Sequence, residues 1–147
     1  MVASYLLLLE VLGEVSVPLG SRTWSLSRGY FVYIGSSSYP RPYLRVLRHL
    51  SPAKRRRWHV DHLTTCPQVK PVAGILLYGV SEGELYLALA SSSIFEAAIP
   101  GFGSTDSRGH LTHLFRLKEV EGADPTRTLL ELAQATAPHL VEVVLAG

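Results

Sequence analysis

The 147-residue sequence contains one cysteine, Cys66, which excludes an intramolecular disulfide and is typical of a protein in the reducing cytoplasm. Long apolar runs are also missing. The run at residues 6–9 has no basic segment before it and is ended by Glu10, so we expect neither a signal peptide nor a membrane span. Because 47% of the residues are apolar and 18% are charged, residues 1–147 are expected to form one globular domain with an ordinary core.

Acidic residues are absent between Glu14 and Asp61. The same interval contains nine basic residues: Arg22, Arg28, Arg41, Arg45, Arg48, Lys54, Arg55, Arg56 and Arg57. A solvated basic face explains many charge runs, and the excess of arginine over lysine, eleven to three, also fits a GC-rich or thermophilic source. A run of this length nevertheless favours a polyanionic partner, since guanidinium groups bind phosphates in a bidentate manner. We therefore predict a nucleic-acid partner.

Apolar patterning and turn residues predict a mixture of strands and helices. Strands are expected at residues 4–12, 14–17, 22–26, 30–35, 72–80 and 114–118. Helices are expected at residues 43–50, 52–65, 82–91 and 125–137, the last three after the N-caps Ser51, Ser81 and Asp124. Residues 139–146 fit either a strand or a helix. The predicted fold is α/β of the α+β type: strands 4–12, 22–26 and 30–35 form a small central antiparallel sheet flanked by helices, with residues 120–147 as a C-terminal helical extension.

Five short motifs carry a resemblance to a known family. Residues 33–35, Tyr-Ile-Gly, resemble the second half of the GIY-YIG nuclease motif, and residues 3–5, Ala-Ser-Tyr, resemble a worn first half. The finer similarity is to a small branch of that superfamily whose members occur alone or fused to endonuclease-III-type DNA glycosylases. The similar stretches are GYFVYIGSS (29–37), RVLRHL (45–50), WHVDHL (58–63), GELYLALA (83–90) and PGFGSTDSRGHLTHLF (100–115). One such motif is weak evidence, whereas five in the right order are fairly specific.

The resemblance implies a GIY-YIG-like fold and a nuclease that hydrolyses DNA phosphodiesters, in repair or recombination, with a single Mg2+ or Mn2+ ion. In that superfamily one helix glutamate holds the metal, and Glu84 is the matching residue. Glu82 and Glu96 remain alternatives, in case the motif is aligned with the wrong glutamate. Glu84 also follows Ser81 by three residues, a spacing that helix capping explains without any metal.

The resemblance also assigns roles to two tyrosines and an arginine. Tyr5 would help to activate the attacking water, Tyr33 would line the same site, and Arg45 would stabilise the charge of the phosphate. Because a phenol has a pKa near 10, we expect Arg45 to lower the pKa of these tyrosines. Ordinary strand packing is the alternative explanation for both rings. His49 and His59 match positions at which relatives carry a histidine or tyrosine near the phosphate.

Other features leave the function open between two classes. The basic residues predicted to bind nucleic acid are Arg41, Arg48, Lys54, Arg55, Arg56 and Arg57. Ala3 replaces the first glycine of the motif, and Ser107 and Gly109 replace two cysteines of the branch. A zinc site at residues 59–62 (His-Val-Asp-His) has weak support, since no further ligand cluster accompanies it. The alternative to the nuclease is a catalytically inactive GIY-YIG-like module that binds nucleic acid. DNA is the expected partner, while the sequence leaves RNA open and predicts no oligomeric state.

Overall fold

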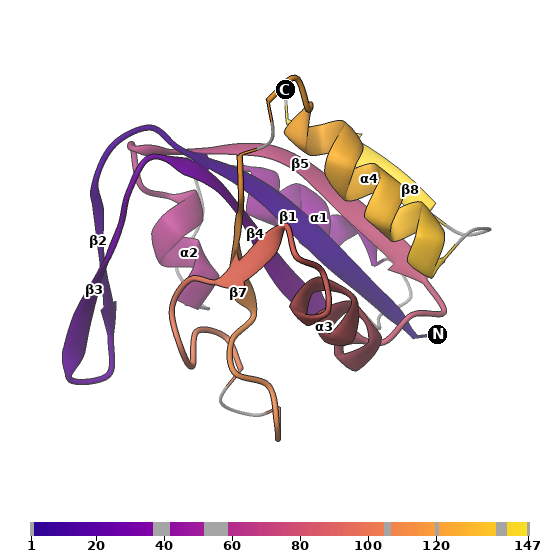
Figure 1. The fold of residues 1–147 in the computed structure, drawn as a ribbon, viewed down its shortest axis with the longest axis horizontal. Helices are drawn as coiled ribbons and strands as arrows, with labels where there is room; N and C mark the ends of the chain where they lie inside the picture. Colours follow the sequence, from indigo (N-terminus) through magenta and orange to yellow (C-terminus); the bar gives the residue numbers. More distant parts are fainter. Residues whose placement is uncertain are drawn as a thin grey trace.

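The computed structural model describes residues 2–36, 42–51, 59–104, 107–119, 121–137 and 141–146. Its main feature is a six-stranded sheet in the order β6-β7-β4-β1-β5-β8, in which every neighbouring pair is antiparallel (Figure 1). The strands are β1 (Ala3–Val11), β4 (Gly29–Ser36), β5 (Val69–Tyr78), β6 (Phe95–Ala97), β7 (Leu114–Leu117) and β8 (Val141–Leu145). This confirms the predicted α+β class with an antiparallel sheet.

Strand β1 is one of the two central strands because both of its faces are apolar. Alternate side chains of a strand point to opposite faces, so Leu6 and Leu8 enter one core while Tyr5 and Leu7 enter the other. Strand β1 pairs with β4 from Ser4 to Val11 on one side and with β5 from Ala3 to Val11 on the other. The apolar run at the start of the sequence is therefore explained by burial on both sides.

Four helices cover the two faces of the sheet. Helices α1 (Tyr43–Leu50) and α2 (His59–Thr64) pack on one face, through side chains that include Val46 and Leu63. Helices α3 (Glu82–Ala90) and α4 (Pro125–Thr136) pack on the other, and Figure 1 shows α4 in front of the sheet and α1 behind it. The predicted N-caps of α3 and α4 are confirmed, because Ser81 accepts a hydrogen bond from the backbone N–H of Glu84 and Asp124 accepts one from Thr126.

The placement of residues 22–26 in the central sheet is wrong. Strand β3 (Arg22–Leu26) pairs instead with β2 (Val15–Leu19) in a separate two-stranded sheet, which projects to one side of the molecule in Figure 1. The reason is that both edges of β1 are already paired with β4 and β5, so β1 has no edge left for a third partner. Strand β2 also continues through Pro18. Each strand of a two-stranded sheet has one unpaired edge, and a proline, which lacks an N–H donor, is tolerated at such an edge.

The C-terminal region is helical only in part. Helix α4 matches the prediction, but residues 141–145 form β8, which pairs with β5 at the edge of the main sheet. The description of residues 120–147 as a helical extension is therefore wrong for its last strand, since an unpaired edge of β5 offers backbone hydrogen bonds to an extended segment. Of the predicted helix at 52–65, residues 59–64 are helical and 52–58 lie outside the described residues. No helix among the described residues is long and apolar enough to cross a membrane.

Candidate functional site

The two tyrosines of the motif meet at the end of the sheet where β1 begins and β4 ends. Tyr5 lies opposite Gly35 in the β1–β4 ladder, and Tyr33 lies two residues before Gly35 on the same face. The ring centroids of Tyr5 and Tyr33 are 6.4 Å apart. Both side chains are buried, with exposed fractions of 3% for Tyr5 and 8% for Tyr33. The structure thus brings together the two sequence halves on which the resemblance rests.

Gly35 makes room for the ring of Tyr5. A Cβ atom at position 35 would lie 2.0 Å from the ring carbon Cζ of Tyr5, which is far too short for two heavy atoms that are not bonded to each other. Gly103 has the same relation to the other tyrosine, since a Cβ there would lie 2.8 Å from the ring of Tyr33. The glycine that ends the motif is therefore required by close packing against the first tyrosine.

We predict that Gly35→Ala lowers the free energy of unfolding by about 1–3 kcal/mol, the usual cost of overpacking a core. Gly83→Ala is the matched control, because a Cβ there meets its nearest atom only at 3.8 Å and alanine favours a helix. The control should be neutral or stabilising by up to about 1 kcal/mol. Urea unfolding of both variants measures the difference, and equal stability would mean that Tyr5 does not pack on Gly35.

Helix α1 places two more predicted site residues beside Tyr5. The hydroxyl of Tyr5 lies 2.9 Å from Nε2 of His49, a buried hydrogen bond. Arg45, four residues earlier and therefore on the same face of the helix, donates a hydrogen bond of 2.6 Å to the carbonyl oxygen of Ser36 at the end of β4. Tyr5, Tyr33, Arg45 and His49 thus lie at the same end of the sheet, and their predicted roles stay predictions.

Arg48 contacts a carboxylate of α2. Its guanidinium group donates hydrogen bonds of 3.0 and 2.9 Å to the two oxygens of Asp61, whose side chain is completely buried. Asp61 Oδ1 also lies 3.7 Å from Nδ1 of His49. This bidentate pair gives Arg48 a role in joining α1 to α2, and its predicted contact with nucleic acid stays a prediction.

Burial dominates the ionisation of both tyrosines. It raises the pKa of Tyr5 and of Tyr33 well above the ordinary value of 10, and the charge of Glu82 raises both further. Arg45 lowers each pKa, as expected, but its effect is smaller than that of burial. The net effect is a raised pKa for each phenol, and both hydroxyls are protonated at neutral pH.

Of the three candidate metal-binding glutamates, Glu82 is the one whose charge acts on the tyrosines. Its carboxylate is half-buried, accepts a hydrogen bond of 3.4 Å from Ser107, and acts electrostatically on Tyr5 and Tyr33. Burial also raises its own pKa above the ordinary value. Glu84, the residue that the motif favoured, is exposed, and its carboxylate accepts a hydrogen bond of 3.3 Å from Ser81 in the helix cap. Glu96 is exposed on β6.

Two histidines that the sequence did not single out as site residues extend the site. His113 is buried, and its Nδ1 lies 3.4 Å from Oε1 of Glu82. Its Nε2 lies 2.8 Å from Nδ1 of His110, on whose ring Tyr86 stacks at a centroid distance of 4.2 Å. The HLTH pattern at 110–113 was the available signal, but the distance of 28 residues between Glu82 and His110 gives no hint of contact.

Acidic pH should destabilise the protein through His113. Burial lowers the pKa of His113 from 6.5 to about 4, so the unfolded chain binds more protons than the folded one between these values. The neutral ring of His113 makes its full contribution to the free energy of unfolding above pH 6.5. This contribution, about 1–3 kcal/mol, is lost as the pH falls to about 4. Glu82 acts in the opposite direction because its pKa is raised.

We therefore predict that His113→Gln removes part of the loss of stability between pH 7 and pH 4. Urea unfolding of the wild type and the variant in metal-free buffer across this pH range isolates the contribution of His113, because both proteins contain Glu82 and its contribution largely cancels in the comparison. An unchanged slope of stability against pH in the variant would contradict this prediction.

The donor chemistry fits a magnesium ion better than a zinc ion. Among the described residues, no group of three or more His, Cys, Asp or Glu side chains could hold a metal ion. Asp61 is paired with Arg48, Nε2 of His62 lies 3.2 Å from the carbonyl oxygen of Ser16, and the side chain of His59 lies outside the described part. A single carboxylate does fit Mg2+, which keeps several waters and binds substrate phosphates directly. Glu82 would supply that carboxylate.

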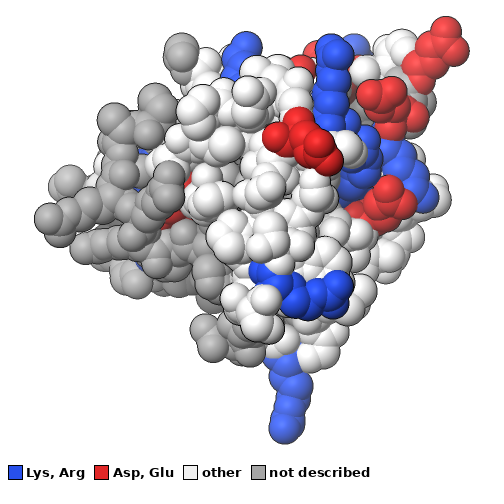
Figure 2. Space-filling model, turned by 90° about the vertical axis from the view of Figure 1, so that its left-hand side faces the viewer, with Lys and Arg blue, Asp and Glu red and all other residues white. Residues whose placement is uncertain are grey.

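The predicted nucleic-acid surface lies mostly outside the described residues. This holds for Arg41, Lys54, Arg55, Arg56 and Arg57. Figure 2 shows one face of the molecule, on which Lys and Arg side chains form separate groups among uncharged residues and are mixed with acidic side chains toward one edge. The basic interval of the sequence therefore does not produce one continuous basic surface among the described residues of this face.

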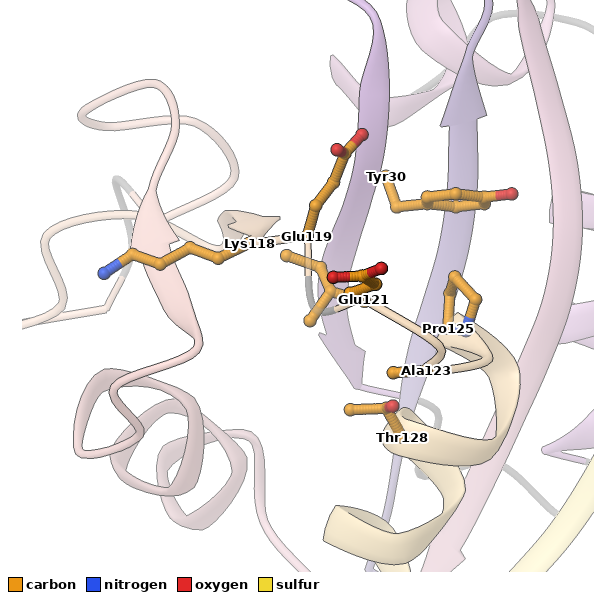
Figure 3. A pocket seen from close by; sticks show the side chains of 8 residues that line it. Tyr30, Lys118, Glu119, Glu121, Ala123, Pro125 and Thr128 are labelled. Atoms are coloured by element: carbon orange, nitrogen blue, oxygen red, sulfur yellow. The ribbon is translucent and has the colours of Figure 1, made fainter.

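A cavity of about 580 Å³ lies elsewhere, between β7, the start of α4 and Tyr30 of β4 (Figure 3). Its lining residues are Tyr30, Leu117, Lys118, Glu119, Glu121, Ala123, Pro125 and Thr128. None of them contacts the tyrosine site in the interactions described above. This cavity does not contribute to the site.

The fold and the site together define a small α+β domain with paired tyrosines, a buried histidine and a carboxylate at one end of an antiparallel sheet. Comparison with known families then places the chain: it belongs to the family described as Domain of unknown function DUF123, whose family model matches residues 4–135. No curated protein and no solved structure matches the chain.

Proposed function

We propose that this protein is a metal-dependent nuclease of the GIY-YIG type that hydrolyses phosphodiester bonds in DNA. One observation carries the proposal: both tyrosines of the motif and Arg45 lie at the same end of the sheet, and Glu82, from a fourth element, acts electrostatically on both tyrosines. A strand pair that only needed packing would not require an arginine and a carboxylate beside two buried phenols.

Each side chain has a task in this proposal. Arg45 stabilises the negative charge that develops on the phosphate. Glu82 holds a Mg2+ or Mn2+ ion, which when bound would polarise the scissile phosphate and stabilise the leaving oxygen. Tyr5 orients the attacking water through its hydroxyl, and Tyr33 lines the wall of the site. With a single cysteine and a DNA substrate, the protein would act in the reducing cytoplasm.

A catalytically inactive DNA-binding module is the second candidate. The observation that favours it is the burial of Tyr5 and Tyr33, which leaves 3% and 8% of these residues exposed and keeps their hydroxyls protonated. A fold of this type would then serve only to present basic side chains to the phosphate backbone. The two candidates differ in whether a divalent metal changes the outcome.

The experiment that tests the proposal incubates the purified protein with supercoiled plasmid in Mg2+, in Mn2+ and in EDTA. The nuclease predicts nicked plasmid with either metal and none in EDTA. Binding to a labelled duplex is measured in EDTA as salt increases, where log affinity should fall by about 0.9 per phosphate contact. Salt-dependent binding without nicking in any metal would select the binding module, and neither activity would reject both.

A further inference from the structure

A buried series of polar side chains runs from Tyr5 away from the sheet. The hydroxyl of Tyr5 lies 2.9 Å from Nε2 of His49, and Nδ1 of His49 lies 3.7 Å from Oδ1 of Asp61. The exposed fractions of the three residues are 3%, 1% and 0%. A phenol, an imidazole and a carboxylate thus follow one another in an interior that excludes most solvent. Asp61 comes from α2, an element that the motif tyrosines do not belong to.

Asp61 is held in place by an arginine of α1. Arg48 donates to both of its oxygens, at 3.0 and 2.9 Å. A bidentate pair of this kind fixes the orientation of a carboxylate and compensates its buried charge. The side chain of Arg48 is 25% exposed while that of Asp61 is completely buried, so Arg48 is the residue of this series that reaches solvent. The negative charge next to His49 is therefore a fixed feature of the fold.

We propose that Asp61 is a positioning residue that keeps the proton of His49 on Nδ1, so that Nε2 accepts the hydrogen bond from the Tyr5 hydroxyl. A distance of 3.7 Å is longer than a hydrogen bond, and the effect is electrostatic. An N–H dipole facing the carboxylate is attracted, whereas a nitrogen lone pair facing it is repelled. The partner of one ring nitrogen thereby decides which nitrogen carries the proton.

This inference rests on the proposed nuclease function for its consequence in catalysis. During hydrolysis the water oxygen forms a bond to phosphorus while the bond to the leaving oxygen breaks, and the leaving oxygen keeps the electron pair and is protonated from solvent. The water proton passes to the Tyr5 oxygen as the Tyr5 proton passes to Nε2 of His49. The imidazolium formed faces Asp61, whose charge stabilises it, and later returns its proton to solvent.

The test combines Asp61→Asn with nitrogen NMR of the histidine rings and with plasmid nicking. In the wild type at pH 8, the spectrum should show His49 protonated on Nδ1 only. An asparagine can accept from Arg48 while its NH2 group faces His49, so the variant should carry the proton on Nε2. Its nicking rate at saturating DNA should fall about 10²–10⁴-fold, with unchanged DNA affinity in EDTA. Asp124→Asn, a change at the cap of α4, should alter neither readout.

The outcomes separate this inference from the proposed function. A wild-type proton on Nε2, or an Asp61→Asn variant that has the reversed tautomer and the full nicking rate, would overturn the inference. If Asp61→Asn does not fold, Tyr5→Phe replaces it in the NMR arm: the proton should stay on Nδ1, and its transfer to Nε2 would show that Tyr5 and not Asp61 sets the tautomer. If the wild type nicks no DNA, the nuclease function fails, while the tautomer still decides the role of Asp61.

Discussion

Replacing Glu82 by glutamine is expected to lower the nicking rate by at least about 10²–10³-fold, whereas the same change at Glu84 leaves it unaltered. Glutamine retains the size of the side chain but loses the charge that a metal ion requires. Glu82 acts electrostatically on both tyrosines, and its raised pKa reflects a partly buried position. Glu84 is exposed and belongs to the cap of α3.

The two changes form a matched pair, because they exchange the same functional group within one turn of the same helix. Glutamine also serves at the third position of a capping box, so Glu84→Gln should change the free energy of unfolding by less than about 0.5 kcal/mol. Plasmid nicking at increasing Mn2+ concentrations measures both variants. If Glu84→Gln loses activity and Glu82→Gln retains it, Glu84 and not Glu82 binds the metal ion.

Tyr5→Phe is expected to lower the turnover rate by about 10²–10⁴-fold without changing the affinity for DNA. The change removes one oxygen, which makes the 2.9 Å hydrogen bond to Nε2 of His49 and is the proposed contact to water. The ring that packs on Gly35 is retained, so the cost in stability should stay near 1 kcal/mol, the usual value for one buried hydrogen bond.

Tyr78→Phe provides the control for this prediction. The Tyr78 hydroxyl also donates a hydrogen bond, of 2.9 Å to Glu142, but at the exposed edge between β5 and β8. Single-turnover nicking and anisotropy binding in EDTA separate catalysis from affinity for both variants. If the two tyrosine variants cleave DNA at the same rate, Tyr5 takes no part in the reaction.

The sequence predicted the features that local patterns determine. An uninterrupted apolar run at residues 6–9 requires burial on two faces, and β1 is a central strand. The resemblance to the GIY-YIG motif implied that Tyr5 and Tyr33 share a site, and the two strands that carry them pair side by side. The helix predicted at residues 43–50 is also confirmed, as α1, and it carries both Arg45 and His49.

The features that the sequence did not predict depend on contacts between distant segments. Glu82 and Glu84 are two residues apart in the sequence, and only their positions in the folded α3 decide which of them acts on the tyrosines. The neighbours of Asp61 and His113 come from 13 and 31 residues away, across elements whose packing is not local. Strand β3 is not part of the central sheet because β4 and β5 already pair with both edges of β1. Which strands pair with β1 cannot be read from the sequence of one segment alone.

Anomalous diffraction from a crystal of the protein soaked in Mn2+ would locate the metal ion itself. We expect one manganese ion on the carboxylate of Glu82, beside the end of the sheet where Tyr5, Tyr33 and Arg45 lie. An ion on Glu84 or Glu96 instead, or no ion at Glu82 at millimolar Mn2+, would contradict this expectation.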